Sequence, residues 1–172
     1  DMMRRTATLQ VNLDYTSEEN MTRMMRVSQA IHPIISGLFA NSPFYEGKLS
    51  EYKSFRNRVW LDTDPDRCGL LPFVHKKGMG FEAYLQYLLD IPMYFIYRDG
   101  KYINAAGKSF RDFIKGDLDV YKGAATMDDF YDQMTIAFPE ARLKTFIEIR
   151  GIDASPHAFA SGALYTGLFY DD

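Results

Sequence analysis

Two stretches, one near each end of the chain, alternate with the period of two that is typical of β-strands. In the run TATLQVNLDY over residues 6–15, apolar residues occupy the odd positions and polar residues the even ones. In the run RLKTFIEIRGID over residues 142–153, Thr145, Ile147 and Ile149 face one way, and Phe146, Glu148 and Arg150 face the other. Successive side chains of a strand point to opposite faces, so both runs predict strands that carry polar groups on one face.

Between these strands, the apolar residues take the spacing of helices. Ser17 followed by two glutamates is typical of a helix N-cap, and helical spacing continues to Ile31. Pro33 is expected to break or kink this helix before an apolar helical pattern resumes over residues 34–40. The mixture of strands, hairpins and separate helices predicts an α+β fold without an internal repeat or linker. Further elements are expected in GFEAYLQYLLD (helix), MYFIYRDGKYI (hairpin turning on Asp99-Gly100), residues 109–115 (helix) and residues 127–137 (helix).

Composition narrows the class of protein. The 172 residues carry a formal net charge of −3, which argues against a general nucleic-acid binder because such proteins have an excess of basic residues. No apolar run approaches the roughly 20 residues that a membrane span requires. A single cysteine, Cys68, cannot form an internal disulfide, so a cytoplasmic location is expected. Both ends of the sequence adjoin structured runs, and we expect residues 1–172 to be the central portion of a single, longer catalytic domain without an internal boundary.

The pair Glu148-x-Arg150 is the most informative chemical feature. A spacing of two in a strand puts both side chains on one sheet face, about 7 Å apart. A carboxylate in that position can hold a hard divalent cation, and the guanidinium can hold a phosphate or carboxylate beside it. The alternative interpretation is a salt bridge on a solvated face, which would contribute little to stability.

Two further sets of residues are candidates for ligand binding. Gln10 and Asn12 share a strand face, and their neutral amides can ligate or hydrogen-bond a nucleotide without adding charge. Three arginines, at positions 56, 58 and 67, could clamp an anionic substrate. Aspartates at 62, 64 and 66 lie close by in the sequence, so internal pairing of these arginines is the alternative.

Five long runs follow one another along the chain: MMRRTATLQVNLDY, LFANSPFYEGK, SFRNRVWLDTDPDRCGLLPFV, LDIPMYFIYR and FPEARLKTFIEIRGID. Together they resemble the glutamate–cysteine ligases of the plant and alphaproteobacterial type. The resemblance covers essentially the whole chain, although those enzymes are more than twice as long. It implies a glutamine-synthetase-like fold, in which an antiparallel sheet forms a cradle with helices packed on one side.

The resemblance also implies an activity and a role for individual residues. Such enzymes use ATP and Mg²⁺ to join the γ-carboxylate of glutamate to the amine of cysteine, the first step of glutathione synthesis, through a γ-glutamyl phosphate. Glu148 matches a metal-binding carboxylate, and Arg150 matches the arginine beside the transferred phosphate. Gln10, which stands where related ligases have a histidine, and Asn12 would face the metal or the nucleotide. The carboxylate and amine substrates would be bound by Arg56, Arg67, Asn41, Ser42 and Tyr94.

Two other functions remain open at this stage. The first keeps the ligase chemistry with a different amine acceptor, because no residue in the sequence fixes cysteine. The second is a non-catalytic binding module of the same fold, which would lack magnesium-dependent nucleotide binding. In either case the expected partners are small molecules, with no nucleic acid and no membrane.

Overall fold

The computed structural model describes residues 2–171, and it confirms the mixed α+β composition predicted from the sequence. The chain forms two compact units. Unit 1 comprises the chain up to Gly80 together with the segment from Pro139 onward, and unit 2 is Phe81–Phe138. No linker in the sequence marks this division, and membership of the whole chain in one catalytic domain stays a prediction. Among the described residues, none of the helices combines the length and apolar character needed to cross a membrane.

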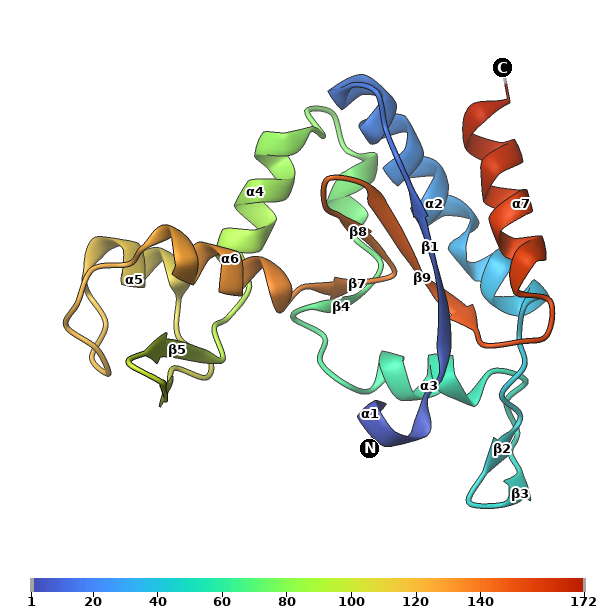
Figure 1. Ribbon diagram of the computed structural model, residues 1–172, viewed down its shortest axis with the longest axis horizontal. Helices are drawn as coiled ribbons and strands as arrows, with labels where there is room; N and C mark the ends of the chain where they lie inside the picture. The colour runs from blue at the N-terminus through green and yellow to red at the C-terminus, as the bar shows by residue number, and fades with distance from the viewer. Residues whose placement is uncertain (1, 172) are drawn as a thin grey trace. The chain divides into compact units, whose positions relative to one another are not determined.

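Unit 1 is built on a three-stranded antiparallel sheet in the order β1–β9–β8 (Figure 1). The strands are β1 (Thr8–Leu13), β9 (Ile147–Asp153) and β8 (Ala141–Leu143). Two helices pack against it, α2 (Glu18–Leu38) on β9 and β8, and α7 (Ala158–Tyr170) on β1. The run RLKTFIEIRGID is therefore not one strand. Its first residues end β8, and a turn leads into β9.

Helix α2 shows which sequence signals were decisive. The hydroxyl of Ser17 accepts a hydrogen bond from the backbone N–H of Asn20, as expected of an N-cap. The expected break at Pro33 is wrong, because the helix runs on to Leu38 without interruption. Proline removes only one helical hydrogen bond, and its ring lies on the exposed side here. Met25 and Ile35, before and after it, are both buried, so packing holds the two halves in one helix.

The pairing of β1 with β9 contains one irregularity, which lies at Arg150. Leu9 is opposite Ile152, but Val11 is opposite Ile149, so two residues of β9 stand against one residue of β1. This is a β-bulge at Arg150–Gly151, and it moves every later residue of β9 to the other sheet face. Bulges occur often beside active sites, where they redirect side chains.

Unit 2 has its own apolar core beside a two-stranded hairpin. The hairpin joins β5 (Phe95–Arg98) and β6 (Lys101–Asn104) through Asp99-Gly100, where both residues have positive φ, as predicted. Its helices are α4 (Phe81–Asp90), α5 (Phe110–Lys115) and α6 (Met127–Thr135). The buried core consists of Met93, Ile96, Ala105, Phe110, Phe113 and Leu118.

The remaining elements are short. These elements are α1 (Met2–Arg5), β2 (Phe44–Tyr45), β3 (Lys48–Leu49), α3 (Phe55–Leu61), β4 (Cys68–Gly69), η1 (Pro72–His75) and β7 (Phe138–Pro139). A small hairpin pairs β2 with β3, and a 3₁₀ helix follows the aspartates at positions 62, 64 and 66.

Candidate functional site

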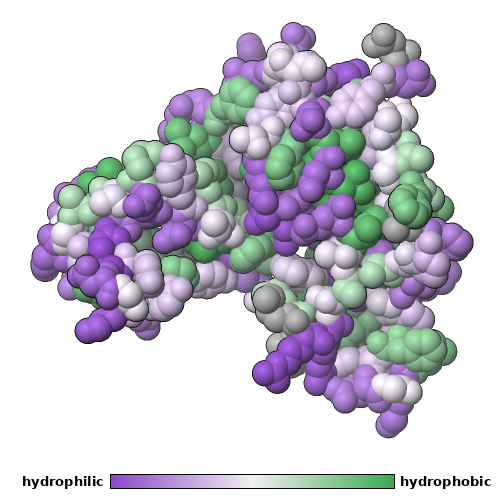
Figure 2. Space-filling view, in the orientation of Figure 1, coloured by the Kyte–Doolittle hydropathy of each residue, from purple (hydrophilic) through white to green (hydrophobic). Residues whose placement is uncertain are grey.

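The sheet of unit 1 has one polar face, on the side away from α2 and α7. Asn12 on β1 is directly opposite Glu148 on β9, and Glu148 is directly opposite Arg142 on β8. Residues that stand opposite each other point to the same side of a sheet. Figure 2 shows hydrophilic side chains gathered over these strands. We call this surface the polar face and define it by Gln10, Asn12, Arg142, Glu148 and Arg150.

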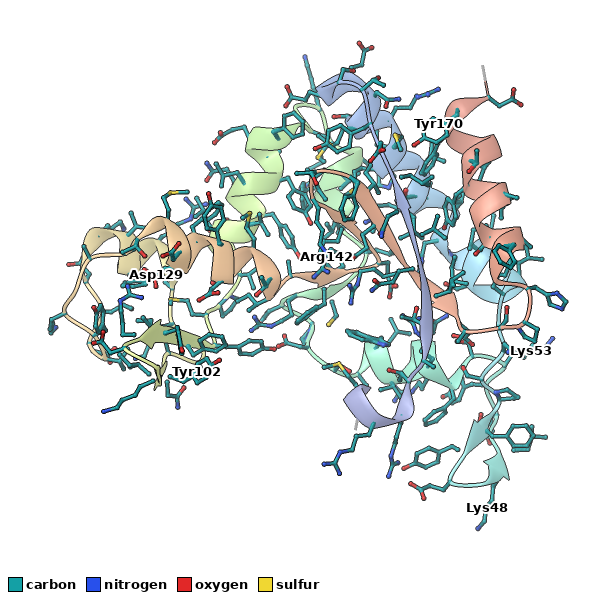
Figure 3. The ribbon with its side chains drawn as sticks, in the orientation of Figure 1. Lys48, Lys53, Tyr102, Asp129, Arg142 and Tyr170 are labelled. Carbon is teal, nitrogen blue, oxygen red and sulfur yellow. The ribbon has the colours of Figure 1, made fainter. Side chains whose placement is uncertain are left out.

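Three cationic side chains surround the carboxylate of Glu148. Its Oε2 atom accepts hydrogen bonds from Nε of Arg142 at 2.7 Å and from Nη1 of Arg150 at 2.9 Å. Its Oε1 atom lies 3.1 Å from Nζ of Lys144. Figure 3 shows Arg142 at β8, an edge strand of the sheet. We call this group the cation cluster: Arg142, Lys144 and Arg150 around Glu148.

The cation cluster carries more positive than negative charge. Three cations and one carboxylate sum to 3 − 1 = +2. Burial raises the pKa of Glu148, but the hydrogen bonds and charges of Arg150, Arg142 and Lys144 outweigh it, so the pKa lies below its ordinary value. The carboxylate is therefore ionised at neutral pH. Lys144 is the most exposed of the three cations, whereas Arg142 and Arg150 are mostly buried. A site with a surplus of cations is suited to binding an anion such as a phosphate.

The residues of this chain do not by themselves fit a magnesium ion. Both oxygens of Glu148 are engaged by cations, whereas a metal ligand needs an oxygen directed at the metal. Within residues 2–171 there is no group of three histidine, cysteine, aspartate or glutamate side chains placed to hold a metal. The metal-binding roles of Glu148 and Gln10 stay predictions, and they require ligands from outside the described residues.

Arg56 is buried and contacts the backbone of the polar face, and its side chain is not part of that face. Ser54 caps α3 by accepting a hydrogen bond from the N–H of Asn57, which places Arg56 in the first turn of that helix. The side chain is buried, and its Nη2 atom donates to the backbone carbonyl of Arg150 at 2.6 Å. Burial lowers the pKa of this guanidinium, an effect that Glu140 and Asp153 offset in part. In this arrangement Arg56 supports the backbone of Arg150, and its contact with a substrate stays a prediction.

No pattern in the sequence singles out Trp60, yet its ring lies close to Arg56 and Arg150. The guanidinium carbons of Arg56 and Arg150 are each 5.9 Å from the centre of its ring. Contacts of this length are cation–π interactions, which are worth about 0.5–2 kcal/mol each. Trp60 thus helps to hold both guanidinium groups in place.

The other two arginines of the α3 region pair with neighbouring acids. Nε of Arg67 lies 2.6 Å from a carboxylate oxygen of Asp64, and the arginine is only 4% exposed. Nη2 of Arg58 lies 3.7 Å from Oδ2 of Asp62. The alternative of internal pairing is therefore what the geometry shows for both, and a substrate-binding role for Arg67 stays a prediction.

Asn41 and Ser42 lie beside the end of β9. The backbone N–H of Asn41 and the hydroxyl of Ser42 both donate to Oδ2 of Asp153, at 2.8 and 2.7 Å. Tyr94 belongs to unit 2 and is 38% exposed. The predicted substrate contacts of Asn41, Ser42 and Tyr94 stay predictions.

Three residues of this region were missed in the sequence: Arg142, Lys144 and Asp153. The first two lie across a tight turn from Glu148, and a hairpin in LKTF was not recognised because it has no glycine or asparagine. Simple alternation would have put Asp153 on the apolar face with Ile147 and Ile149, whereas the bulge puts it on the other side.

Comparisons with known proteins agree with the resemblance noted in the sequence. The glutamate-cysteine ligase family 2 (GCS2) matches residues 1–172. The chloroplastic glutamate–cysteine ligase of Nicotiana tabacum is 50% identical over all of this chain, which covers 34% of that protein. The chloroplastic glutamate–cysteine ligase A of Oryza sativa subsp. japonica and the chloroplastic glutamate–cysteine ligase of Arabidopsis thaliana are each 49% identical over the whole chain, which covers 36% and 34% of them.

These relatives show how much of the enzyme the chain covers, correct the expected location and identify the family. The chain spans about a third of the length of the curated relatives it matches. The expected cytoplasmic location is wrong by this comparison, because the relatives are chloroplastic enzymes, and a lone cysteine does not distinguish two reducing compartments. With a family match over its full length and half of its residues shared with the tobacco enzyme, the chain belongs to glutamate-cysteine ligase family 2.

Proposed function

We propose that this chain provides the anion-binding sheet face of an ATP-dependent glutamate–cysteine ligase. The reaction would phosphorylate the γ-carboxylate of glutamate and pass the γ-glutamyl group to the amine of cysteine, the first step of glutathione synthesis. The observation that carries the proposal is the cation cluster, with three cations around one carboxylate. Its surplus charge suits the transfer of a phosphoryl group between two anions, which repel each other in water.

Each residue of the polar face has a role in this proposal. Arg142, Lys144 and Arg150 bind the phosphate oxygens and stabilise the charge that develops during transfer. Glu148 keeps these cations in position, and the neutral amides of Gln10 and Asn12 face the nucleotide. Asn41, Ser42, Arg56 and Arg67 belong to the side that binds glutamate, and Tyr94 to the side that binds cysteine.

Two further parts of the proposal extend beyond the described residues. The three-stranded sheet is one part of a larger antiparallel cradle of the glutamine-synthetase-like type, with α2 and α7 on its outer side. Magnesium accompanies ATP and would screen its phosphates when bound. Its ligands come mainly from segments outside this chain.

The decisive experiment tests for a γ-glutamyl phosphate by following an ¹⁸O atom from glutamate to inorganic phosphate. The full polypeptide that contains this chain is supplied with ATP, cysteine and glutamate labelled with ¹⁸O in the γ-carboxylate. A γ-glutamyl phosphate transfers one labelled oxygen to the inorganic phosphate that is released, and mass spectrometry detects it. Unlabelled phosphate together with γ-glutamylcysteine as product would contradict the acyl-phosphate route.

A second set of reactions identifies the amine acceptor. ADP release is measured with glutamate and cysteine together, with either one omitted, and with other amino acids in place of cysteine. We expect the full rate only with cysteine. A higher rate with another amine would contradict the assignment of cysteine and would support a ligase with a different acceptor. No glutamate-dependent ADP release with any amine would contradict the ligase proposal itself.

A further inference from the structure

Asp153 ends β9 on the polar side of the sheet because of the bulge at Arg150–Gly151. After the bulge, Ile152 takes the place on the buried side, and Asp153 stands opposite Thr8. Gly151 fits at the bulge because its backbone passes close to α2. A Cβ atom there would overlap the imidazole of His32 and lie 2.8 Å from Oε2 of Glu140.

The carboxylate of Asp153 joins three separate segments of unit 1. Its Oδ2 atom accepts hydrogen bonds from the N–H of Asn41 and the hydroxyl of Ser42, and its Oδ1 atom accepts one from the hydroxyl of Ser54 at 2.8 Å. The Asp153 residue is only 2% exposed. A buried carboxylate that accepts hydrogen bonds from three neutral donors holds them in position, because the carboxylate would otherwise be left without partners.

These hydrogen bonds lead directly to Arg56. Ser42 Oγ, while donating to Asp153, accepts the backbone N–H of Arg56 at 3.0 Å. Ser54 Oγ, while donating to Asp153, caps α3 just before Arg56. The guanidinium of Arg56 then donates to the backbone carbonyl of Arg150. That carbonyl lies at the bulge, where it also accepts from Thr8 Oγ1.

We propose that Asp153 is a positioning residue for the binding of the carboxylate substrate, because it fixes the Asn41–Ser42 turn and the start of α3 against the bulge of β9. The proposal rests on the proposed function for the substrate itself. The hydrogen bonds of Asp153 go to Asn41, Ser42 and Ser54, whereas Glu148 performs the corresponding task for the cation cluster at the other end of β9. Loss of the Asp153 carboxylate should therefore change the affinity for glutamate much more than the affinity for the nucleotide.

The test compares substitutions in the full polypeptide. Asp153→Asn keeps the size of the side chain but replaces one accepting oxygen by an amide that cannot accept. We expect KM for glutamate to rise on the order of 10- to 100-fold, and KM for ATP to change by no more than about twofold. Ser54→Ala should raise KM for glutamate by a smaller factor, and Ser54→Thr, which keeps the hydroxyl, should restore it.

Unit 2 provides a matched control. Asp129 is also a buried carboxylate that accepts from a helix cap, the N–H and hydroxyl of Thr126. Asp129→Asn should lower thermal stability without changing the ratio of the two KM values. If Asp153→Asn behaves in the same way, with stability reduced and KM for glutamate unchanged, Asp153 is structural only and the proposal is overturned.

A measurement without substrate separates this inference from the proposed function. Hydrogen exchange is followed at the amides of Asn41 and Arg56, with the amide of Ile149 in the sheet as reference. Asp153→Asn should speed exchange at the first two amides by at least about tenfold relative to the reference, whereas Asp129→Asn should not. Unchanged protection would overturn the positioning role even if the enzyme proves to be a ligase. Faster exchange in a protein without glutamate-dependent turnover would leave this role standing and overturn only the proposed function.

Discussion

The two units of this protein each contain a buried carboxylate that is held by arginine, but the two carboxylates differ in charge balance. In unit 2, Asp129 binds a single cation, Arg98, through both of its oxygens, and Thr126 supplies the remaining hydrogen bonds. In unit 1, Glu148 binds three cations. The first group has no net charge, and the second has a surplus.

We propose that this difference in charge balance distinguishes a structural ion pair, at Asp129, from an anion-binding site, at Glu148. Burial raises the pKa of Asp129, but the hydrogen bonds from Arg98 and Thr126 outweigh it and leave the pKa below its ordinary value, as for Glu148. A lowered pKa therefore does not separate the two carboxylates. The proposal rests instead on the surplus of cations around Glu148, because like charges repel each other and a bound anion would reduce that repulsion.

The largest effect on stability is expected in unit 2. Replacing Arg98 by Met removes the arginine that binds both oxygens of Asp129 and leaves a buried charge, at a cost of about 3–5 kcal/mol in the free energy of unfolding. Chemical denaturation measures this cost. Turnover per folded molecule should stay unchanged. A stable variant with reduced turnover would mean that unit 2 also has a catalytic role.

In unit 1 the corresponding change should affect activity instead. Arg150→Ala leaves Glu148 with Arg142 and Lys144, so the carboxylate remains paired and the fold survives. The loss of one phosphate-binding group should lower kcat/KM about 10²- to 10³-fold. Arg111→Ala, which removes an exposed arginine bonded to Asp90 in unit 2, is the control and should leave kcat/KM unchanged. Equal rates for Arg150→Ala and the unaltered protein would refute the assignment.

The bulge should be intolerant of even a methyl group. Gly151→Ala would force the new Cβ against His32 and Glu140, and we expect a loss of about 1–3 kcal/mol of unfolding free energy. Gly162→Ala on α7, where a Cβ would meet nothing within 4 Å, is the matched control. Thermal denaturation compares the two variants. Equal stability would show that the packing of α2 on the bulge is looser than described.

The smallest expected effect is a change in the free energy of unfolding with pH. Burial lowers the pKa of His32, which Glu140 raises in part and Arg56 lowers further. The unfolded chain therefore binds a proton at His32 more readily than the folded chain, so this contribution to stability is complete above about pH 6.5 and is lost as the pH falls through the lowered pKa. We expect unfolding free energy to decline on the order of 1 kcal/mol or less between about pH 7 and pH 5. His32→Gln should flatten this decline, and an unchanged slope would contradict the role of His32.

The local elements could largely be predicted from the sequence, because their signals are local. The alternation over residues 8–13, the caps at Ser17 and Ser109 and the turn at Asp99-Gly100 all appear in the structure. The break at Pro33 does not, since the packing of both halves of α2 on the sheet outweighs one missing hydrogen bond. Propensity yields to tertiary packing where the two compete.

The sequence by itself determined that Glu148 and Arg150 share a sheet face, because the period of a strand is a property of the backbone alone. The tertiary structure decided how much charge surrounds Glu148, since Arg142 and Lys144 reach it only across the β8–β9 hairpin. It also decided that Arg56 lies beneath the site and that Asp153 joins the polar side. Both positions depend on a one-residue bulge in the pairing of β1 with β9. These strands lie near opposite ends of the sequence, and a pairing of that kind leaves no local signal in either segment.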